Sequence, residues 1–171
     1  LAEFGRLDIV VANAGVDTPT SFVKQGLADF RAIFDTSFFG NLHLAHAAWP
    51  HLLQQRYGRM VLTASSAGLH ANHGQSAYSA AKSGLHRYVQ ALRAEVLHEP
   101  IVITELAPGY IDTDMNHHEW LTDAGKRLID TLPRKRIGQP KDLDVVLMML
   151  CANESHFING AVIQADDGYA L

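Results

Sequence analysis

Four short apolar runs rich in β-branched residues recur along the chain, and each one leads into a turn of small or glycine-containing residues. They are Leu7–Ala12, Arg59–Ala64, Ile101–Leu106 and Ala161–Ala165. Continuous apolar runs of this length are typical of strands that are buried on both faces of a parallel sheet. The chain is therefore predicted to form parallel strands whose carboxyl ends open into loops.

Stretches with helical periodicity separate these runs. Apolar side chains recur every three or four residues over Asp29–Gln55, and Ala77–His98 is rich in alanine and leucine. Pro140–Cys151 predicts a further helix, whereas Pro50 is expected to kink or break the helix that contains it. Alternating strands and helices predict an α/β fold, a Rossmann-like doubly wound parallel sheet, in a single domain over residues 1–171.

Composition excludes several classes of protein. Hydrophobic residues make up 47% of the 171 residues and charged residues 19%, which is typical of a globular domain. The formal net charge of −4 argues against a nucleic-acid partner, which requires clustered basic charge. No apolar run approaches the roughly 18 residues of a membrane span, so no membrane partner is expected. Cys151, the single cysteine, cannot form an internal disulfide, which favours a cytoplasmic location.

Polar and small residues follow the predicted strands. Asn13 follows the first strand, Ser65 the second, and Pro108-Gly109 the third. Because the carboxyl ends of parallel strands meet at one edge of the sheet, where ligands bind in open α/β sheets, we expect a functional site there.

Tyr78 and Lys82 lie four residues apart on a predicted helix, so both side chains point to the same face, one turn apart. A nearby ammonium group favours the phenolate, and a tuned tyrosine can donate a proton to a carbonyl or take one from an alcohol. Such a pair alone is more often two solvated side chains. Ser65, thirteen residues before Tyr78, can hydrogen-bond the same substrate oxygen, which strengthens the catalytic interpretation.

These residues stand in motifs that resemble those of the short-chain dehydrogenase/reductase family, in its order and spacing and over essentially the whole chain. The motifs are Asn13-Ala14-Gly15, Ser65, Tyr78-Ser79-Ala80-Ala81-Lys82, Pro108–Thr113, Arg136–Leu143 and Gly160–Gly168. The resemblance implies an oxidoreductase that uses NAD or NADP to interconvert a secondary alcohol and a ketone. It also implies a small-molecule alcohol or ketone substrate, and a homodimer or homotetramer assembled through the two long helices.

The resemblance also assigns roles. Tyr78 would be the catalytic acid/base, Ser65 would orient and polarise the reacting oxygen, and Lys82 would lower the pKa of Tyr78 and bind the nicotinamide ribose. The other expected cofactor-binding residues lie near the adenosine (Asn13, Ala14, Gly15) or around the nicotinamide carboxamide (Pro108, Gly109, Ile111, Thr113). No metal site is expected, because the histidine pairs His70/His73 and His117/His118 offer no third ligand.

One departure from the family concerns the cofactor phosphates. The family begins with a strand, a glycine-rich turn and a helix that bind the pyrophosphate, and no such glycine run follows a strand here. The chain opens at Leu1 and is expected to be a fragment that lacks about three strands and binds cofactor poorly alone. The strand Leu7–Ala12 would then present an unpaired apolar edge. A non-catalytic scaffold that has lost its nucleotide-binding half is the alternative.

A second departure is Ser37, which stands where the family has an asparagine that supports a water chain from the lysine. A serine can hold a water with fewer hydrogen-bonding groups, so Ser37 stays a candidate catalytic residue. Asn41, one turn further on, is either a substitute or a surface or helix-packing residue. Met115 and Trp120 either shape an apolar pocket or serve only in packing.

Overall fold

The structure, a computed structural model, describes residues 3–170, so Leu1, Ala2 and Leu171 of the predicted domain lie outside the described part. Its strands are β1 (Ile9–Ala12), β2 (Gly58–Thr63), β3 (Ile101–Pro108) and β4 (Val162–Ala165). They form one parallel sheet in the order β1-β2-β3-β4. This confirms the predicted Rossmann-like parallel sheet.

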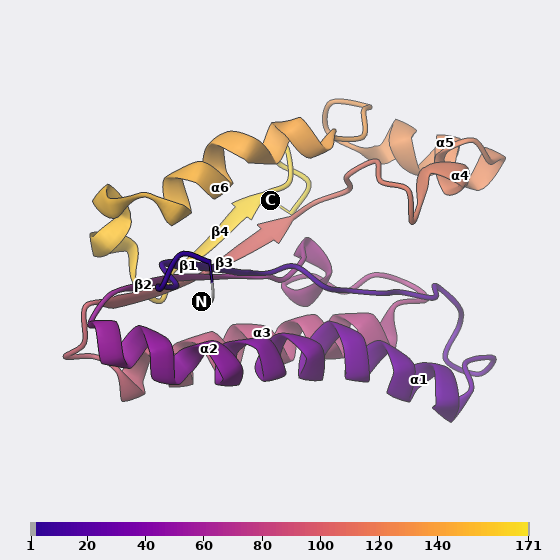
Figure 1. Ribbon diagram of the computed structural model, residues 1–171. Helices are drawn as coiled ribbons and strands as arrows, with labels where there is room; N and C mark the ends of the chain where they lie inside the picture. Colours follow the sequence, from indigo (N-terminus) through magenta and orange to yellow (C-terminus); the bar gives the residue numbers. More distant parts are fainter. Residues whose placement is uncertain (1–2, 171) are drawn as a thin grey trace.

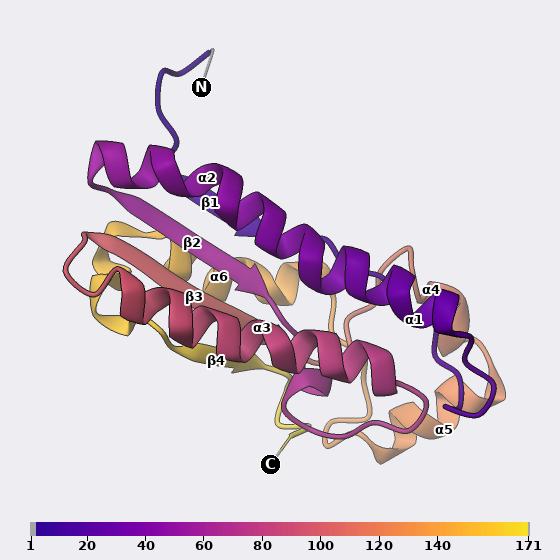
Figure 2. The ribbon, with the colours of Figure 1, turned by 90° about the horizontal axis from the view of Figure 1, so that it is seen from below.

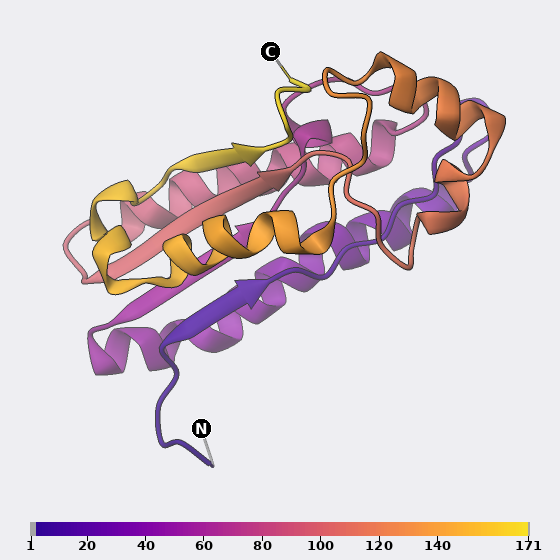
Figure 3. The same ribbon diagram turned by 90° about the horizontal axis from the view of Figure 1, so that it is seen from above.

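Helices cover both faces of this sheet. One face carries a long helical segment, made of α1 (Leu27–Phe34), a π-helical stretch over Asp35–Gly40 and α2 (Asn41–Gln55), together with α3 (Ser76–Glu95) (Figure 2). The opposite face carries α6 (Asp144–Cys151) (Figure 1). The short helices α4 (His117–Trp120) and α5 (Asp123–Thr131) lie beyond the carboxyl ends of the strands (Figure 3). Among the helices described, none is long and apolar enough to cross a bilayer.

The irregularity in the long helical segment does not fall at Pro50. Helix α2 continues through this proline, so the predicted break is wrong. Both Pro50 and His46, whose carbonyl would otherwise pair with an N–H at position 50, lie on the exposed side of α2. The helix changes instead at the π-helical stretch, a kind of insertion that is frequent at functional sites.

The core lies mainly between the sheet and the α2–α3 layer, where Leu52, Met60, Leu62, Leu85 and Ile103 are fully buried. A smaller cluster joins Val61 of β2 and Leu106 of β3 to Leu150 of α6 on the opposite face of the sheet.

Strand β1 differs from the prediction that it is buried on both faces. Its Val10 and Ala12 are buried, whereas Ile9 and Val11 are 44% and 37% exposed. No described strand pairs with its outer edge.

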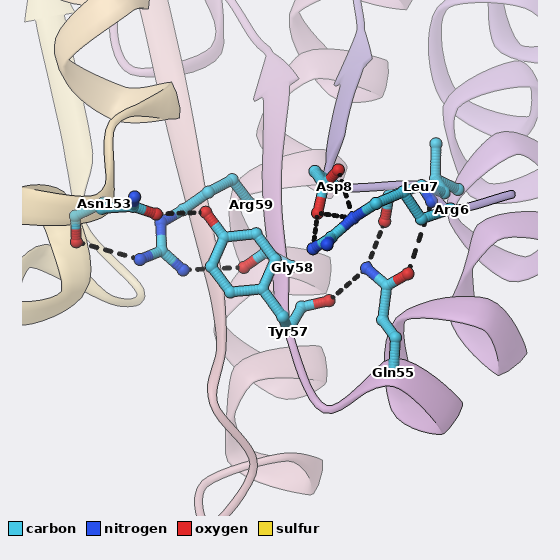
Figure 4. Close-up of polar contacts among 8 residues, drawn as sticks. All are labelled: Arg6, Leu7, Asp8, Gln55, Tyr57, Gly58, Arg59 and Asn153. Atoms are coloured by element: carbon cyan, nitrogen blue, oxygen red, sulfur yellow. Dashed lines mark hydrogen bonds and ion pairs between the residues drawn. The ribbon is translucent and has the colours of Figure 1, made fainter. Parts of the chain in front are cut away.

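A polar cluster fastens the amino-terminal ends of the strands (Figure 4). Gln55, the last residue of α2, accepts from the Leu7 N–H and donates to the Tyr57 carbonyl at 2.8 Å. The buried Arg59 donates to the carbonyls of Ala152 and Asn153, both at 3.0 Å. These bonds tie β1, β2 and the connection from α6 to β4 together at the edge opposite the expected site.

Arg59→Met is expected to lower the free energy of unfolding by about 3 kcal/mol, because it removes the hydrogen bonds that the buried guanidinium donates to three backbone carbonyls. The third of these is the carbonyl of Gly58, at 3.0 Å. Urea denaturation measures the change. The matched control is Arg56→Met, which removes only an exposed ion pair to Glu99 at 3.5 Å and is expected to change stability by less than about 1 kcal/mol. Equal losses in the two variants would contradict a structural role for the Arg59 bonds.

Candidate active site

A cavity of about 600 Å³ opens at the carboxyl ends of β1, β2 and β3. Among the residues that line it are nine of the predicted site residues: Asn13, Gly15, Ser65, Tyr78, Lys82, Pro108, Gly109, Ile111 and Thr113. Met115 and Trp120 line it too, which agrees with the first of their two expected roles, that of shaping an apolar pocket. The sheet topology therefore brings together residues from four separate stretches of sequence, as the positions of the strand ends predicted.

The β2–α3 connection places Ser65 against the helix that carries Tyr78. Ser65 ends the extended segment after β2 and accepts a hydrogen bond from the Ala67 N–H at 3.1 Å, which caps the short 3-10 turn Ser66–Gly68. A methyl group at Gly68 would lie 2.9 Å from the carbonyl carbon of Lys82. Because only glycine permits this approach, the turn packs directly on α3.

Lys82 is almost completely buried, with 2% of its surface exposed. Its ammonium group donates to the Thr63 carbonyl at 2.7 Å and lies 5.7 Å from the centroid of the Tyr78 ring. Burial lowers the pKa of Lys82 to about 8, and the negative charge of Glu105 opposes this change. At neutral pH the ammonium form of Lys82 is therefore only slightly more stable than the neutral amine.

The pKa of Tyr78 moves in the direction opposite to that expected from the resemblance. Burial raises it to about 12, a hydrogen bond with Ser65 lowers it, and the charge of Asp17 raises it further. Burial disfavours the phenolate because the charged form loses its hydration. In this state the tyrosine is a protonated acid at neutral pH.

Ser37 and Ala14, both predicted site residues, do not line the cavity. The Ser37 hydroxyl is fully buried, donates to the Val16 carbonyl at 2.8 Å and accepts from the Val16 N–H at 2.9 Å. It therefore fastens the loop that follows β1. A methyl group at Gly15 would lie 3.4 Å from Lys82 Nζ and 3.7 Å from Ser37 Oγ, so Gly15 stands between these two groups.

Asn41 is a packing residue in the interior and not a surface residue. It is 1% exposed, and its amide donates to the carbonyls of Ala14 at 3.1 Å and Ser37 at 3.0 Å. These bonds join the loop after β1 to the π-helical stretch.

A chain of hydrogen bonds along the cavity was not predicted from the sequence. Asp17 accepts from Gln75 at 2.5 Å, and Gln75 accepts from Asn72 at 2.9 Å. Asn72 in turn accepts from the Tyr169 hydroxyl at 3.1 Å. Asp17, Asn72 and Gln75 line the cavity, and burial raises the pKa of Asp17. The four residues of this chain come from three loops: one after β1, one before α3 and one after β4. No motif in the sequence relates the three loops.

The donor set of the cavity fits the nicotinamide end of a dinucleotide. A cationic group, Lys82, lines it together with Gly15 and Gly109, at which no side chain projects into the space. A volume of about 600 Å³ lies within the usual range for small-molecule sites. Among residues 3–170, no group of three or more metal-ligating side chains converges.

The fold is that of the Rossmann-like class of α/β proteins, and the comparisons with known proteins give the family. The family model described as Enoyl-(Acyl carrier protein) reductase matches residues 1–170. The 3-oxoacyl-[acyl-carrier-protein] reductase of Chlamydia muridarum is 31% identical over 99% of this chain and 68% of its own length. The acetoacetyl-CoA reductase of Cupriavidus necator is 31% identical over 98% of this chain and 68% of its own length.

Two solved structures agree with this relationship. The structure of gox2181 has a TM-score of 0.94 at 28% identity and covers 98% of this chain and 67% of its own. Levodione reductase has a TM-score of 0.93 at 26% identity and covers 99% of this chain and 69% of its own. The chain belongs to the short-chain dehydrogenase/reductase family, and it spans about two thirds of the length of these relatives.

Proposed function

We propose that this chain carries the catalytic group of an NAD(P)-dependent oxidoreductase that interconverts a secondary alcohol and a ketone. The observation that carries the proposal is the convergence of Ser65, Tyr78 and Lys82 in one cavity at the carboxyl edge of the sheet. The names of the relatives in Chlamydia muridarum and Cupriavidus necator, both reductases, support the same chemistry.

In this mechanism Tyr78 donates its proton to the carbonyl oxygen during reduction and takes it back during oxidation. Ser65 donates a hydrogen bond to the same oxygen and so holds it next to the phenol. A bound nicotinamide supplies or accepts the hydride. With a pKa of about 12 the Tyr78 phenol is protonated at neutral pH, which is the state that proton donation requires. In the oxidation direction the phenolate requires nearby positive charge, to which the Lys82 ammonium contributes.

The residues proposed to hold NAD or NADP are those on the side of the cavity formed by the ends of β1 and β3. Lys82 and Tyr78 would contact the nicotinamide ribose, and Asn13 and Gly15 would pack near the adenosine side of the cofactor. Pro108, Gly109, Ile111 and Thr113 would enclose the carboxamide. Ala14 and Ser37 would contribute indirectly: neither lines the cavity, and their hydrogen bonds hold the loop after β1 in place.

The small-molecule alcohol or ketone would occupy the side lined by Asp17, Asn72 and Gln75. The carboxylate of Asp17 and the amide groups beside it favour a substrate that offers hydrogen-bond donors near the reacting oxygen. The same carboxylate disfavours a substrate with a negative charge at that position, because two close carboxylates repel each other.

A fluorescence titration with NADH and NADPH tests the proposal. Two proteins are compared: the 171-residue chain, and a chimera that adds the unmatched third of the Thermotoga maritima 3-oxoacyl-[acyl-carrier-protein] reductase, a 29% identical relative. We expect saturable binding by the chimera, weaker binding by the chain alone, and loss of binding in Lys82→Ala. A folded chimera that binds neither nucleotide would contradict the proposal and favour the scaffold alternative.

We also propose a homodimer or homotetramer in which α2 and α3 form the interface. Phe39 and Leu44, on the outer side of the long helical segment, are 43% and 44% exposed, and a second copy would cover them. Size-exclusion chromatography with light scattering is expected to show a mass two or four times that of the single chain. A monomer at micromolar concentration would contradict this assembly.

A further inference from the structure

Tyr169 lies in the turn that follows β4, and hydrogen bonds within this turn fix its position. The carboxylate of Asp166 accepts from the N–H groups of Gly168 and Ala170, both at 3.1 Å. The Asp166 carbonyl accepts from the Tyr169 N–H at 3.1 Å. A methyl group at Gly109 would lie 2.7 Å from the Asp166 Cα, so this glycine lets the turn pack on the end of β3. Tyr169 is therefore held in a defined place.

The hydroxyl of Tyr169 determines how two side-chain amides are oriented. The Asp17 carboxylate only accepts when it is ionised, so Gln75 turns its nitrogen to Asp17 and donates at 2.5 Å. The Gln75 oxygen then faces Asn72, whose nitrogen donates to it at 2.9 Å. The remaining polar atom, Asn72 Oδ1, requires a donor, and the Tyr169 hydroxyl supplies it at 3.1 Å. The carboxylate at one end and the phenol at the other thus fix both amides.

The ring of Tyr169 contacts a second part of the cavity wall. It meets the ring of Tyr110 edge to face, with 5.1 Å between the centroids, and Tyr110 meets Trp120 edge to face at 5.8 Å. Aromatic pairs prefer this arrangement, because the positive edge of one ring faces the negative surface of the other. Trp120 is the last residue of α4 and lines the cavity. Tyr169 therefore joins the loop before α3 to α4.

Tyr169 acts on the cavity only through these neighbours. It lines an adjoining cavity of about 300 Å³, whereas Asp17 and Trp120 line the cavity of about 600 Å³ that contains Tyr78. The two oxygens of Asp17 accept one hydrogen bond each within the protein, from Gln75 and from the Thr18 N–H at 2.8 Å. Because a carboxylate has about four acceptor sites, Asp17 can accept a further bond from a ligand.

We propose that Tyr169 is a positioning residue for the substrate. Its hydroxyl holds the Asp17 carboxylate in place through the two amides, and its ring holds Trp120 in place through Tyr110. Asp17 then accepts a hydrogen bond from a hydroxyl group of the substrate, so that the site selects hydroxyketones over simple ketones. This selectivity rests on the proposed function, whereas the coupling of Tyr169 to Asp17 and Trp120 does not.

Two substitutions separate the contributions of the hydroxyl and the ring: Tyr169→Phe removes the hydroxyl alone, and Tyr169→Leu removes both. The side-chain amide signals of Gln75 and Asn72 in ¹⁵N NMR spectra, assigned by their loss in Gln75→Met and Asn72→Leu, report on the hydroxyl. The emission of Trp120 in a Trp49→Phe background reports on the ring, because the chain has two tryptophans. We expect Tyr169→Phe to shift the amide signals and leave the emission unchanged, and Tyr169→Leu to change both.

Tyr57→Phe is the matched control. It also removes a tyrosine hydroxyl that donates to an asparagine, Asn153 at 2.5 Å, at the opposite edge of the sheet (Figure 4). Both readouts are expected to stay unchanged in this variant. Unchanged amide signals in folded Tyr169→Phe, or unchanged Trp120 emission in folded Tyr169→Leu, would overturn the proposal. If Tyr169→Leu does not fold, a chain that ends at Gly168 removes the same ring and gives the same two outcomes.

Steady-state kinetics tests the selectivity in the chimera with the Thermotoga maritima segment. The probes are acetoin, a hydroxyketone, and butan-2-one, which lacks only the hydroxyl. We expect Tyr169→Phe to raise the KM for acetoin about fivefold, the effect of one lost hydrogen bond, with a smaller change in kcat and little change for butan-2-one. An equal change for both ketones, or a preference of the unmodified chimera for butan-2-one, would overturn the selectivity. Failure of the proposed function would appear instead as absent nucleotide binding in the fluorescence titration.

Discussion

Tyr78→Phe is expected to lower kcat for ketone reduction by at least about 100-fold, because it removes the proton donor and leaves the carbonyl oxygen with Ser65 alone. The aromatic ring stays and keeps its packing against Ile33, Ala77 and Ala81. We therefore expect the free energy of unfolding to change little, and the affinity for the nicotinamide cofactor to fall much less than kcat, because Lys82 keeps its proposed contact with the ribose. Steady-state kinetics at neutral pH, with a fluorescence titration of the cofactor, separates the two effects.

Tyr88→Phe is the matched control for this experiment. Tyr88 lies on the same helix and packs against the main core, and it does not line the cavity. Its substitution is expected to leave kcat unchanged. If the kcat of Tyr78→Phe equals that of the control, Tyr78 is not the proton donor, and another group in the cavity must supply the proton.

The sheet could be predicted because its strands are continuous apolar runs whose ends are marked by small residues. The prediction was least accurate for features that depend on how the elements pair and pack with one another. Strand β3 extends two residues beyond the predicted Leu106, because Ala107 and Pro108 pair with β4. Pro50 was expected to kink or break α2, but the helix continues through it with Pro50 on its exposed side. The sequence of β1 has the continuous apolar pattern of a strand buried on both faces, although one face of this strand is partly exposed in the structure.

The site could be predicted where the residues sit next to a strand end or share a helix face, as Ser65, Tyr78 and Lys82 do. The contact between Gln75 and Asp17 joins residues 58 positions apart, and neither position carries a motif. Glu105 was overlooked because it stands inside an apolar run. It is the single charged residue of β3, and a charge at an inward position of a buried strand is a signal that it has a buried partner.

Lys82→Met is expected to raise the free energy of unfolding at pH 7 by about 2 kcal/mol while it abolishes cofactor binding. Burial lowers the pKa of Lys82 from 10.5 to about 8, so the charged form is disfavoured in the folded state by about 3 kcal/mol even with the attraction of Glu105 included. Loss of the hydrogen bond to the Thr63 carbonyl offsets about 1 kcal/mol of the gain. The lysine is thus retained at the expense of stability, as expected of a functional residue.

The pH dependence of stability gives the sharper measurement for this variant. Because the folded-state pKa of Lys82 is lowered, the unfolded chain binds more protons between about pH 8 and pH 10.5, and stability rises with pH in that window. Lys82→Met lacks this rise, so its advantage in urea denaturation is expected to shrink from pH 8 upward. The control Lys126→Met, at an exposed position of α5, is expected to show no such pH-dependent difference. A Lys82→Met protein that is less stable at pH 7 would show that the Thr63 bond and the Glu105 charge outweigh the burial of the ammonium group.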